Sequence, residues 1–257
     1  MTEQDLLYEV ENHVATITIN REAQRNAISP DALTRFHAYL ELAESDDAVR
    51  VVCLTGAGEK AFCSGADLSG GLDGDDNRAL FDRYARLISR LAVFPKPTLA
   101  RVNGYCLAGG TGFMLGCDIV IAKASAKFGT PEVNVGLFPM MIGALIFRNV
   151  PRKKAMEMIL LGEKLTADQA LNMGLITRVV PDADFDAAVR EVLAALAAKS
   201  PIGMRLGKAA FAAVERMPLE EAVLYLGGKL AEVAATEDAR EGIIAFLEKR
   251  TPQFKGR

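Results

Sequence analysis

The sequence predicts an α/β fold in which strands alternate with covering helices, followed by a region built from helices alone. The first observation is the segment Val49–Thr55, a near-continuous apolar run typical of a parallel strand buried on both faces. The second is the recurring order of strand, helix and strand through about residue 122, which is typical of a sheet with crossover helices. The third is the series of helical patterns that fills the chain after residue 182.

Two short strands open the chain. Residues Leu7–Glu11 and Val14–Ile19 predict strands joined by a hairpin at Asn12-His13. Ser29 and Pro30 then predict a helix start, because serine caps the first turn and proline fits the first helical position. The apolar face of that helix consists of Leu33, Phe36, Leu40 and Ala43.

A second helix is predicted at Asn77–Phe94, and strands follow at Thr98–Val102 and Leu175–Val180. The apolar residues that fall on one face of the helix Asn77–Phe94 are Leu80, Tyr84, Leu87, Ile88 and Leu91. The C-terminal helices are predicted at Asp184–Lys199, Pro201–Met217, Leu219–Ala235 and Glu237–Lys249. We therefore divide the chain into a core of residues 1–181 and a C-terminal helical region of residues 182–257.

The segment Arg101–Ala122 is unusually rich in glycine. Gly104, Gly109, Gly110 and Gly112 fall where a strand, a turn and a short helix are predicted, and a glycine costs a helix about 1 kcal/mol relative to alanine. Without a Cβ the backbone can bring its N–H groups close to a ligand, and the first N–H groups of a helix are unpaired. The segment predicts a site for an anion or an oxyanion, with tight packing of helix on sheet as the alternative.

The composition is that of an ordinary enzyme-like chain. Of its 257 residues 50% are apolar and 25% are charged, and the formal net charge is -3. This predicts neither a nucleic-acid partner, which needs a basic surface, nor a membrane span, which needs a long apolar run. The N-terminus MTEQDLLYEVEN is acidic where a targeting peptide would be basic, so we expect a cytoplasmic location.

Several other kinds of site are not supported by the motifs. The four cysteines form no CxxC pair, so we expect reduced thiols and no metal site. His13 and His37 are predicted to be structural or solvated. Gly56–Ala61 fits the dinucleotide pattern GxGxxG/A, but no helical pattern follows it. Asp73, Asp75 and Asp76 lack the spacing of a calcium loop and predict a solvated surface tip.

Six stretches, in order, resemble the crotonase, or enoyl-CoA hydratase/isomerase, superfamily over essentially the whole chain. They are NREAQRNAIS, VVCLTGAGEKAFCSGADL, KPTLARVNGYCLAGGTGFMLGCDIVIA, KFGTPEVNVGLFP, AMEMILLGEKLTADQALNMGLITRVVP and EGIIAFLEKRTPQF. The resemblance implies a crotonase-like spiral of ββα repeats with a C-terminal helical subdomain that drives trimer or hexamer formation. It also implies an acyl-CoA thioester substrate and no cofactor beyond the coenzyme A of that substrate.

The resemblance assigns roles to individual residues. It implies that the backbone N–H groups of Ala66 and Gly109 form an oxyanion hole for the thioester oxygen, and that Glu132 is the catalytic carboxylate. We predict a structural role for Asp118, in support of the strand that follows the short helix. The residues it implies for substrate binding are Arg25, Ala27, Ala66, Asp67, Leu68, Gly110, Gly112, Phe246 and Lys249. Lys249 is expected to reach a neighbouring subunit's coenzyme A.

One departure from the family pattern decides the expected reaction. Hydratases of the family carry a second glutamate where this chain has Gly112, so we expect an unfilled volume there, opposite Glu132. The apolar residues around Glu132 should raise the pKa of its carboxyl and make it a competent base. The alternative is a structural role, as an acidic residue in the first turn of a helix.

One carboxylate and an oxyanion hole are enough to isomerise a 3-enoyl-CoA to a 2-enoyl-CoA, which is the reaction we favour. A hydratase that recruits another group from residues 68–84, other acyl-CoA chemistry and a non-catalytic acyl-CoA-binding paralogue remain open.

Overall fold

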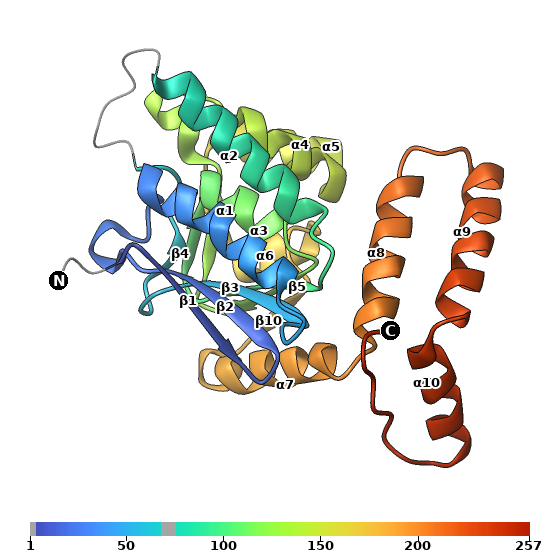
Figure 1. The fold of residues 1–257 in the computed structure, drawn as a ribbon. Helices are drawn as coiled ribbons and strands as arrows, with labels where there is room; N and C mark the ends of the chain where they lie inside the picture. The colour runs from blue at the N-terminus through green and yellow to red at the C-terminus, as the bar shows by residue number, and fades with distance from the viewer. Residues whose placement is uncertain (1–3, 68–75) are drawn as a thin grey trace.

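The structure is a computed structural model that describes residues 4–67 and 76–257. It contains a layered α/β core from which three C-terminal helices project (Figure 1). A sheet of six strands has the order β1-β2-β3-β5-β7-β10, and a second sheet of four short strands has the order β4-β6-β8-β9. The fold class predicted from the sequence is confirmed.

The large sheet begins with the predicted hairpin. Strands β1 (Leu6–Glu11) and β2 (Val14–Ile19) pair antiparallel, and β2 then pairs parallel with β3 (Val51–Gly56). The remaining pairs are also parallel, through β5 (Thr98–Val102) and β7 (Ile119–Lys123) to β10.

The last strand, β10 (Arg178–Val180), is shorter than the predicted strand Leu175–Val180. Leu175 and Ile176 are buried in the core without belonging to a strand. Their apolar character therefore reflects burial rather than strand pairing.

Helices cover both faces of this sheet, as the apolar run Val49–Thr55 predicts. Cys53, Leu99 and Ile121 lie on one face, against Phe185, Val189 and Val192 of helix α7 (Phe185–Ala197). The alternate residues of the same strands join the main core on the other face. That face is covered by α1 (Pro30–Ser45), α2 (Asp76–Ala92) and α3 (Gly109–Leu115) (Figure 1). The alternation follows from the two-residue period of a strand.

The second sheet was not predicted from the sequence as a sheet. Strands β4 (Ala61–Cys63), β6 (Tyr105–Leu107) and β8 (Lys127–Gly129) run parallel to one another, and β9 (Leu165–Thr166) closes one edge antiparallel. Each has only two or three residues, too few to show a period in the sequence. The helices of this half of the core are α4 (Met140–Asn149), α5 (Arg152–Leu161) and α6 (Ala167–Asn172).

Of the predicted C-terminal region, residues 182–257, helix α7 packs on the large sheet of the core. The helices that project are α8 (Pro201–Val214), α9 (Leu219–Ala234) and α10 (Glu237–Leu247), close to their predicted bounds. Asp118 attaches α8 to the core, because its carboxylate pairs with Lys208 of α8 while accepting hydrogen bonds from the backbone and hydroxyl of Thr98 at 2.8 and 3.0 Å. The structural role predicted for Asp118 agrees with these contacts. Helix α9 buries none of its residues in the single chain.

Candidate active site

The three segments that carry the predicted catalytic groups leave the small sheet at the same edge. Strand β4 leads to Ala66, β6 leads to Gly109, and β8 leads to Glu132. These strands are parallel neighbours in the order β4-β6-β8. Since the carboxyl ends of parallel strands meet at one edge of a sheet, residues that follow them converge there.

Ala66 is held by a single bridge to Ile28. The Ile28 N–H donates to the Gly65 carbonyl at 2.8 Å, and the Asp67 N–H donates to the Ile28 carbonyl at 3.0 Å. Both bonds come from the residues beside Ala66. Because successive N–H groups of an extended chain point to opposite sides, the Ala66 N–H faces away from Ile28.

Gly109 is the first residue of α3. The turn before it is fastened to β8, because the Ala108 N–H donates to the Gly129 carbonyl at 3.0 Å and Thr111 Oγ1 lies 3.3 Å from the same oxygen. An ideal Cβ on Gly65 would lie 3.2 Å from the Gly109 nitrogen. The segments of Gly65–Ala66 and Gly109, which are predicted to form the oxyanion hole, are therefore in contact. The N–H of Gly109 has no partner inside its helix because it belongs to the first turn.

Glu132 lies in a short 3₁₀ turn, η2 (Pro131–Val135), and its side chain is partly buried. Burial raises the pKa of this carboxyl above its ordinary value, the direction that the sequence predicted. Exposed apolar residues of the same segment, such as Val135 and Met140, do not supply that burial. Glu132 also lies in the first turn of η2, where an acidic residue can serve a purely structural role. That role agrees with its backbone position but does not explain why its side chain is buried.

Among the residues that the structure describes, four buried side-chain polar atoms lack a hydrogen-bond partner. They are Tyr8 Oη, Tyr84 Oη, Thr130 Oγ1 and Glu132 Oε2. Glu132 and Thr130 follow β8, and the Tyr84 hydroxyl lies against Gly109. Buried polar groups are normally paired, and an unpaired one costs about 1–3 kcal/mol. Three of the four therefore lie on or against the segments that carry the predicted catalytic groups.

Gly112 does not border an open volume, so this part of the sequence prediction is wrong. An ideal Cβ there would lie 2.5 Å from Ile142 Cγ2 and 2.8 Å from Ile88 Cδ1. The space of the missing second carboxylate is filled by two isoleucines. Gly110 has a packing role as well, because its Cβ would lie 2.3 Å from the Cys63 carbonyl oxygen.

The remaining predicted residues of the core lie around Ala66. Ala27 precedes Ile28, and its carbonyl accepts a hydrogen bond from Arg21 at 2.8 Å. The same guanidinium pairs with Asp67 at 2.8 Å. Arg25 is exposed in a left-handed conformation (φ 53°) at the end of η1 (Glu22–Gln24). Leu68 lies outside the described residues, as do the other residues up to 75 of the segment 68–84 from which a second catalytic group was considered.

Sequence reasoning missed the residues that position these loops. Arg21 fixes Asp67, and the Asn26 amide donates to the carbonyls of Ala57 and Ala61 at 3.0 and 2.6 Å. Asn103 Nδ2 makes similar bonds to Gly56, Gly58 and Ala61. Both asparagines lie within the stretches that carry the family resemblance, but only the fold shows that each ties loops together.

Phe246 and Lys249 are not brought to Glu132 within one chain. Both lie at the end of α10, which packs on α8 and α9 away from the core (Figure 1). Phe246 is 82% exposed. This separation is what a contribution to a neighbouring subunit requires.

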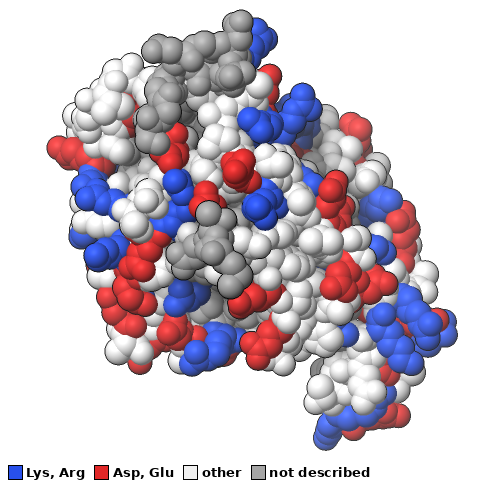
Figure 2. Space-filling view, turned by 60° about the vertical axis from the view of Figure 1, so that its left-hand side comes forward, with Lys and Arg blue, Asp and Glu red and all other residues white. Residues whose placement is uncertain are grey.

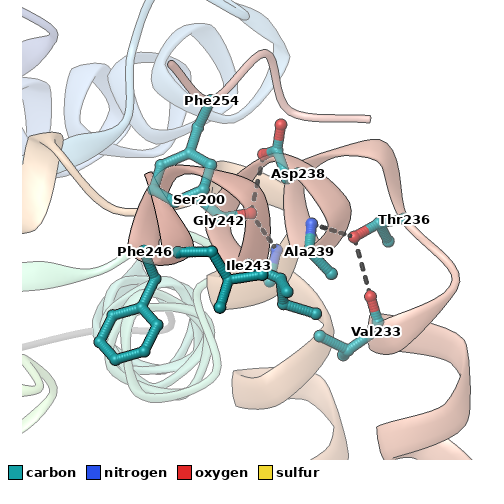
Figure 3. A pocket seen from close by; sticks show the side chains of 11 residues that line it. Ser200, Val233, Thr236, Asp238, Ala239, Gly242, Ile243, Phe246 and Phe254 are labelled. Carbon is teal, nitrogen blue, oxygen red and sulfur yellow. Dashed lines mark hydrogen bonds between the residues drawn. The ribbon is translucent and has the colours of Figure 1, made fainter. Parts of the chain in front are cut away.

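Two hollows on the surface lie away from Glu132. One, of about 360 Å³, lies between α8, α10 and the C-terminal tail; Phe246 and Phe254 line it (Figure 3). Asp238 at its edge accepts hydrogen bonds from Ser200 Oγ at 2.7 Å and from the Lys255 and Gly256 N–H groups, so that carboxylate serves to anchor the tail. The other hollow, of about 780 Å³, separates α8 from α2, α3 and α4.

The groups set aside from the sequence have structural surroundings. His13 Nδ1 lies 2.8 Å from the Ala48 carbonyl, and His37 Nε2 lies 3.1 Å from the Arg83 carbonyl. All four cysteines are free and buried, and burial raises the pKa of the Cys53 and Cys63 thiols to about 12. Acidic and basic side chains are interspersed over the face in Figure 2, in keeping with the small net charge.

Comparison with known proteins decides the family. A model of the enoyl-CoA hydratase/isomerase family matches residues 9–257. The chain belongs to the enoyl-CoA hydratase/isomerase family. It is 36% identical to the 2,3-dehydroadipyl-CoA hydratase of Escherichia coli, over 98% of this chain and 99% of that protein. It is 33% identical to a short-chain-enoyl-CoA hydratase of Clostridium acetobutylicum, over 98% of each chain.

Solved structures of this enoyl-CoA hydratase/isomerase family share the fold over its full length. An enoyl-CoA hydratase from Bacillus anthracis superposes with a TM-score of 0.94 at 33% identity, covering 99% of this chain and 100% of that one. An enoyl-CoA hydratase from Mycobacterium smegmatis gives a TM-score of 0.92 at 34% identity, covering 98% and 99%. The crotonase superfamily resemblance is confirmed. Within the described residues, no helix has the length and apolar character needed to cross a membrane.

Proposed function

We propose that this protein isomerises a 3-enoyl-CoA to the 2-enoyl-CoA, with Glu132 as the single acid–base group. The observation that carries the proposal is the contrast between two positions of the site. Glu132 presents a buried carboxylate oxygen that has no partner among the described residues, whereas residue 112 is a glycine packed against Ile88 and Ile142. A reaction that needs one carboxylate fits this arrangement better than one that needs two.

The proposed reaction begins with the thioester oxygen bound by the N–H groups of Ala66 and Gly109. The Glu132 carboxylate takes a proton from C2, and the electron pair of that C–H bond moves through the carbonyl onto the thioester oxygen. Preorganised donors aimed at such an oxyanion are worth roughly 2.7–4 kcal/mol each. The raised pKa of Glu132 brings the base closer to the pKa suited to proton transfer near neutral pH.

The second step returns the same proton. The electron pair on oxygen re-forms the carbonyl, the C3–C4 π pair takes the proton from the Glu132 carboxyl at C4, and the double bond lies between C2 and C3. Protons and electrons balance without any other reactant, so we propose no cofactor beyond the coenzyme A of the substrate. Arg25, Ala27, Asp67, Leu68 and Gly110 remain our candidates for residues that contact the substrate.

We also propose that the chain acts as a homotrimer or hexamer. Helix α9 has no buried residue, and large apolar side chains stay exposed along α8, α9 and α10. They include Phe211, Leu219, Leu224, Leu230, Phe246 and Leu247. Exposed apolar surface of this extent is typical of an interface. In such an assembly Phe246 and Lys249 would reach a neighbour's site, where a lysine suits a coenzyme A phosphate.

Hydration of a 2-enoyl-CoA is the second candidate. The names of the similar proteins favour it, because both curated relatives described above are hydratases. Hydration requires that a water molecule be held and activated while C2 receives a proton, which is harder with one carboxylate.

The experiment that separates the two is a panel of 2-enoyl and 3-enoyl thioesters of several chain lengths, followed for isomerisation and for hydration. We expect faster turnover of the 3-enoyl thioesters. Faster hydration across the panel would replace the proposal by the second candidate, and binding without either reaction would indicate an acyl-CoA-binding protein.

A further inference from the structure

The hydroxyl of Tyr84 is a buried polar group beside the proposed oxyanion hole. Tyr84 lies on α2, and its ring stacks on Phe113 of α3 with 4.8 Å between centroids and 29° between planes. An ideal Cβ on Gly109 would lie 2.1 Å from Tyr84 Oη and 2.8 Å from Cζ. The phenol therefore occupies the volume where a side chain of residue 109 would begin.

That hydroxyl has no hydrogen-bond partner within the described chain. A phenylalanine would fill the same space and make the same ring contact without burying an unpaired hydroxyl, which costs stability. An unpaired buried group in a folded protein calls for an explanation, and pairing with a bound ligand is one of them. Among the described residues, Glu132 Oε2 is likewise buried without a partner, and the Gly109 N–H, in the first turn of α3, has no partner inside its helix.

The packing of α2 on α3 explains why the polar atom comes from α2. Tyr84 and Ile88 are one turn apart on α2, and they meet Gly109 and Gly112, which are about one turn apart on α3. The Cδ1 methyl group of Ile88 packs against Gly112, the position at which hydratases of the family carry their second glutamate. Tyr84 places a hydroxyl one turn nearer to the start of α3, where the hole donors lie.

We propose that the Tyr84 hydroxyl is a third donor to the thioester oxygen, beside the N–H groups of Ala66 and Gly109. The inference rests on the proposed acyl-CoA site and adds a catalytic residue to it. The phenol keeps its proton throughout, since it only donates a hydrogen bond while the oxygen gains and loses its negative charge. No bond at Tyr84 forms or breaks, so the steps described for Glu132 remain balanced.

The surroundings of Tyr84 favour a donor over a base. Burial raises the pKa of its phenol well above the ordinary value, and Cys63, Cys106 and Glu132 act in the same direction. The group therefore stays protonated at every pH at which the protein is expected to work, and a protonated phenol has one O–H to donate.

The test uses a saturated acyl-CoA with a ¹³C label at the thioester carbonyl, which can be neither isomerised nor hydrated. Its carbonyl stretch is measured by infrared difference spectroscopy when bound to the wild type, to Tyr84→Phe and to Tyr8→Phe. Tyr8→Phe is the matched control because it removes another buried, unpaired phenol hydroxyl, on β1 rather than beside Gly109. We expect a lower frequency in the wild type and Tyr8→Phe than in Tyr84→Phe.

A second variant gives the same test without loss of the hydroxyl. Placing 3-fluorotyrosine at position 84 makes the phenol a stronger donor at almost unchanged size, and we expect the bound carbonyl frequency to fall further. With a reacting thioester, Tyr84→Phe should lower kcat by about 10-fold or more and leave KM within a few fold. Its Tm should equal or exceed that of the wild type, because the unpaired hydroxyl is gone.

Equal carbonyl frequencies in the wild type, Tyr84→Phe and the fluorotyrosine variant would overturn the assignment of Tyr84 while leaving the proposed function intact. Failure of the wild type to bind the labelled acyl-CoA would overturn the proposed function itself, and the Tyr84 assignment with it. The two failures are therefore distinguishable in one experiment.

Discussion

Gly112 and Ile142 are packed so closely that an ideal Cβ on the glycine would lie 2.5 Å from Cγ2 of the isoleucine. The glycine belongs to α3 and the isoleucine to α4, and both are buried. Residue 112 is therefore fixed as glycine by the contact between two helices. The absence of a second carboxylate is a feature of the packed core, and one substitution cannot reverse it.

This contact predicts that Gly112→Ala destabilises the protein by about 1–3 kcal/mol, the usual cost of overpacking a core. Ile142→Ala removes Cγ2, so the double variant should be more stable than the sum of the single effects predicts. Gly143→Ala is the control, because it lies beside Ile142 on α4 and its Cβ would have no neighbour within 4 Å. Thermal unfolding measures all four variants. Strictly additive effects of the two changes would show that the contact is relaxed in solution.

Glu132→Gln is expected to raise the free energy of unfolding at neutral pH. Burial raises the pKa of Glu132 in the folded chain, so its charged form is less stable there than in the unfolded chain. The contribution of protonated Glu132 to the stability of the wild type is fully present below the unfolded pKa of about 4.5. It is lost as the pH rises through the higher pKa of the folded state. The stability gain of the variant should therefore appear above that range and vanish in acid. Urea unfolding from pH 4 to pH 8 checks this, and a pH-independent difference would contradict it.

Ala66→Pro should lower kcat by about 10²–10³-fold, because proline has no N–H to stabilise the oxyanion. The bridge to Ile28 uses the Gly65 carbonyl and the Asp67 N–H, both of which the substitution retains. Ala66→Gly keeps the N–H and serves as the matched control, with near-normal turnover expected. Circular dichroism establishes that both variants are folded. Full activity in a folded Ala66→Pro variant would place the oxyanion hole elsewhere.

Much of the fold could be predicted because local patterns agreed with it. Ser29 caps α1 by accepting a hydrogen bond from the Ala32 N–H at 3.1 Å, as its position before Pro30 predicts. The apolar run Val49–Thr55 is buried on both faces, as its composition predicts. The short strands of the second sheet depend on pairing between distant segments, so their local sequence holds no comparable signal.

The candidate site was predictable only where a motif carries it. Ala66, Gly109 and Glu132 lie in the stretches that resemble the family, and the parallel strands bring them to one edge. Tyr84 is in phase with the apolar residues of its helix, so nothing in the sequence separates it from a core residue. The role of Tyr84 depends on its contact with Gly109, and the role of Gly112 on its contact with Ile142. Only the fold shows these contacts.

The exposed apolar face of α9 predicts an oligomer that a charge can disrupt. Leu224 is 73% exposed in the single chain. Leu224→Glu should give a single-chain mass in light scattering, whereas the wild type should have three or six times the 27.7 kDa of one chain. Glu220→Gln, at a polar position of the same helix, is the control and should leave the mass unchanged. A wild type that is monomeric at micromolar concentration would end this proposal.

The role of Glu132 as the single base is tested most directly by the turnover of a 3-enoyl-CoA by Glu132→Gln, together with the affinity of this variant for the thioester. Glutamine keeps the shape and part of the hydrogen bonding but cannot accept the C2 proton. We expect kcat to fall by about 10²–10⁴-fold, with the Kd of the thioester within a few fold of the wild type. An unchanged kcat in the glutamine variant would contradict the assignment of Glu132 as the single base.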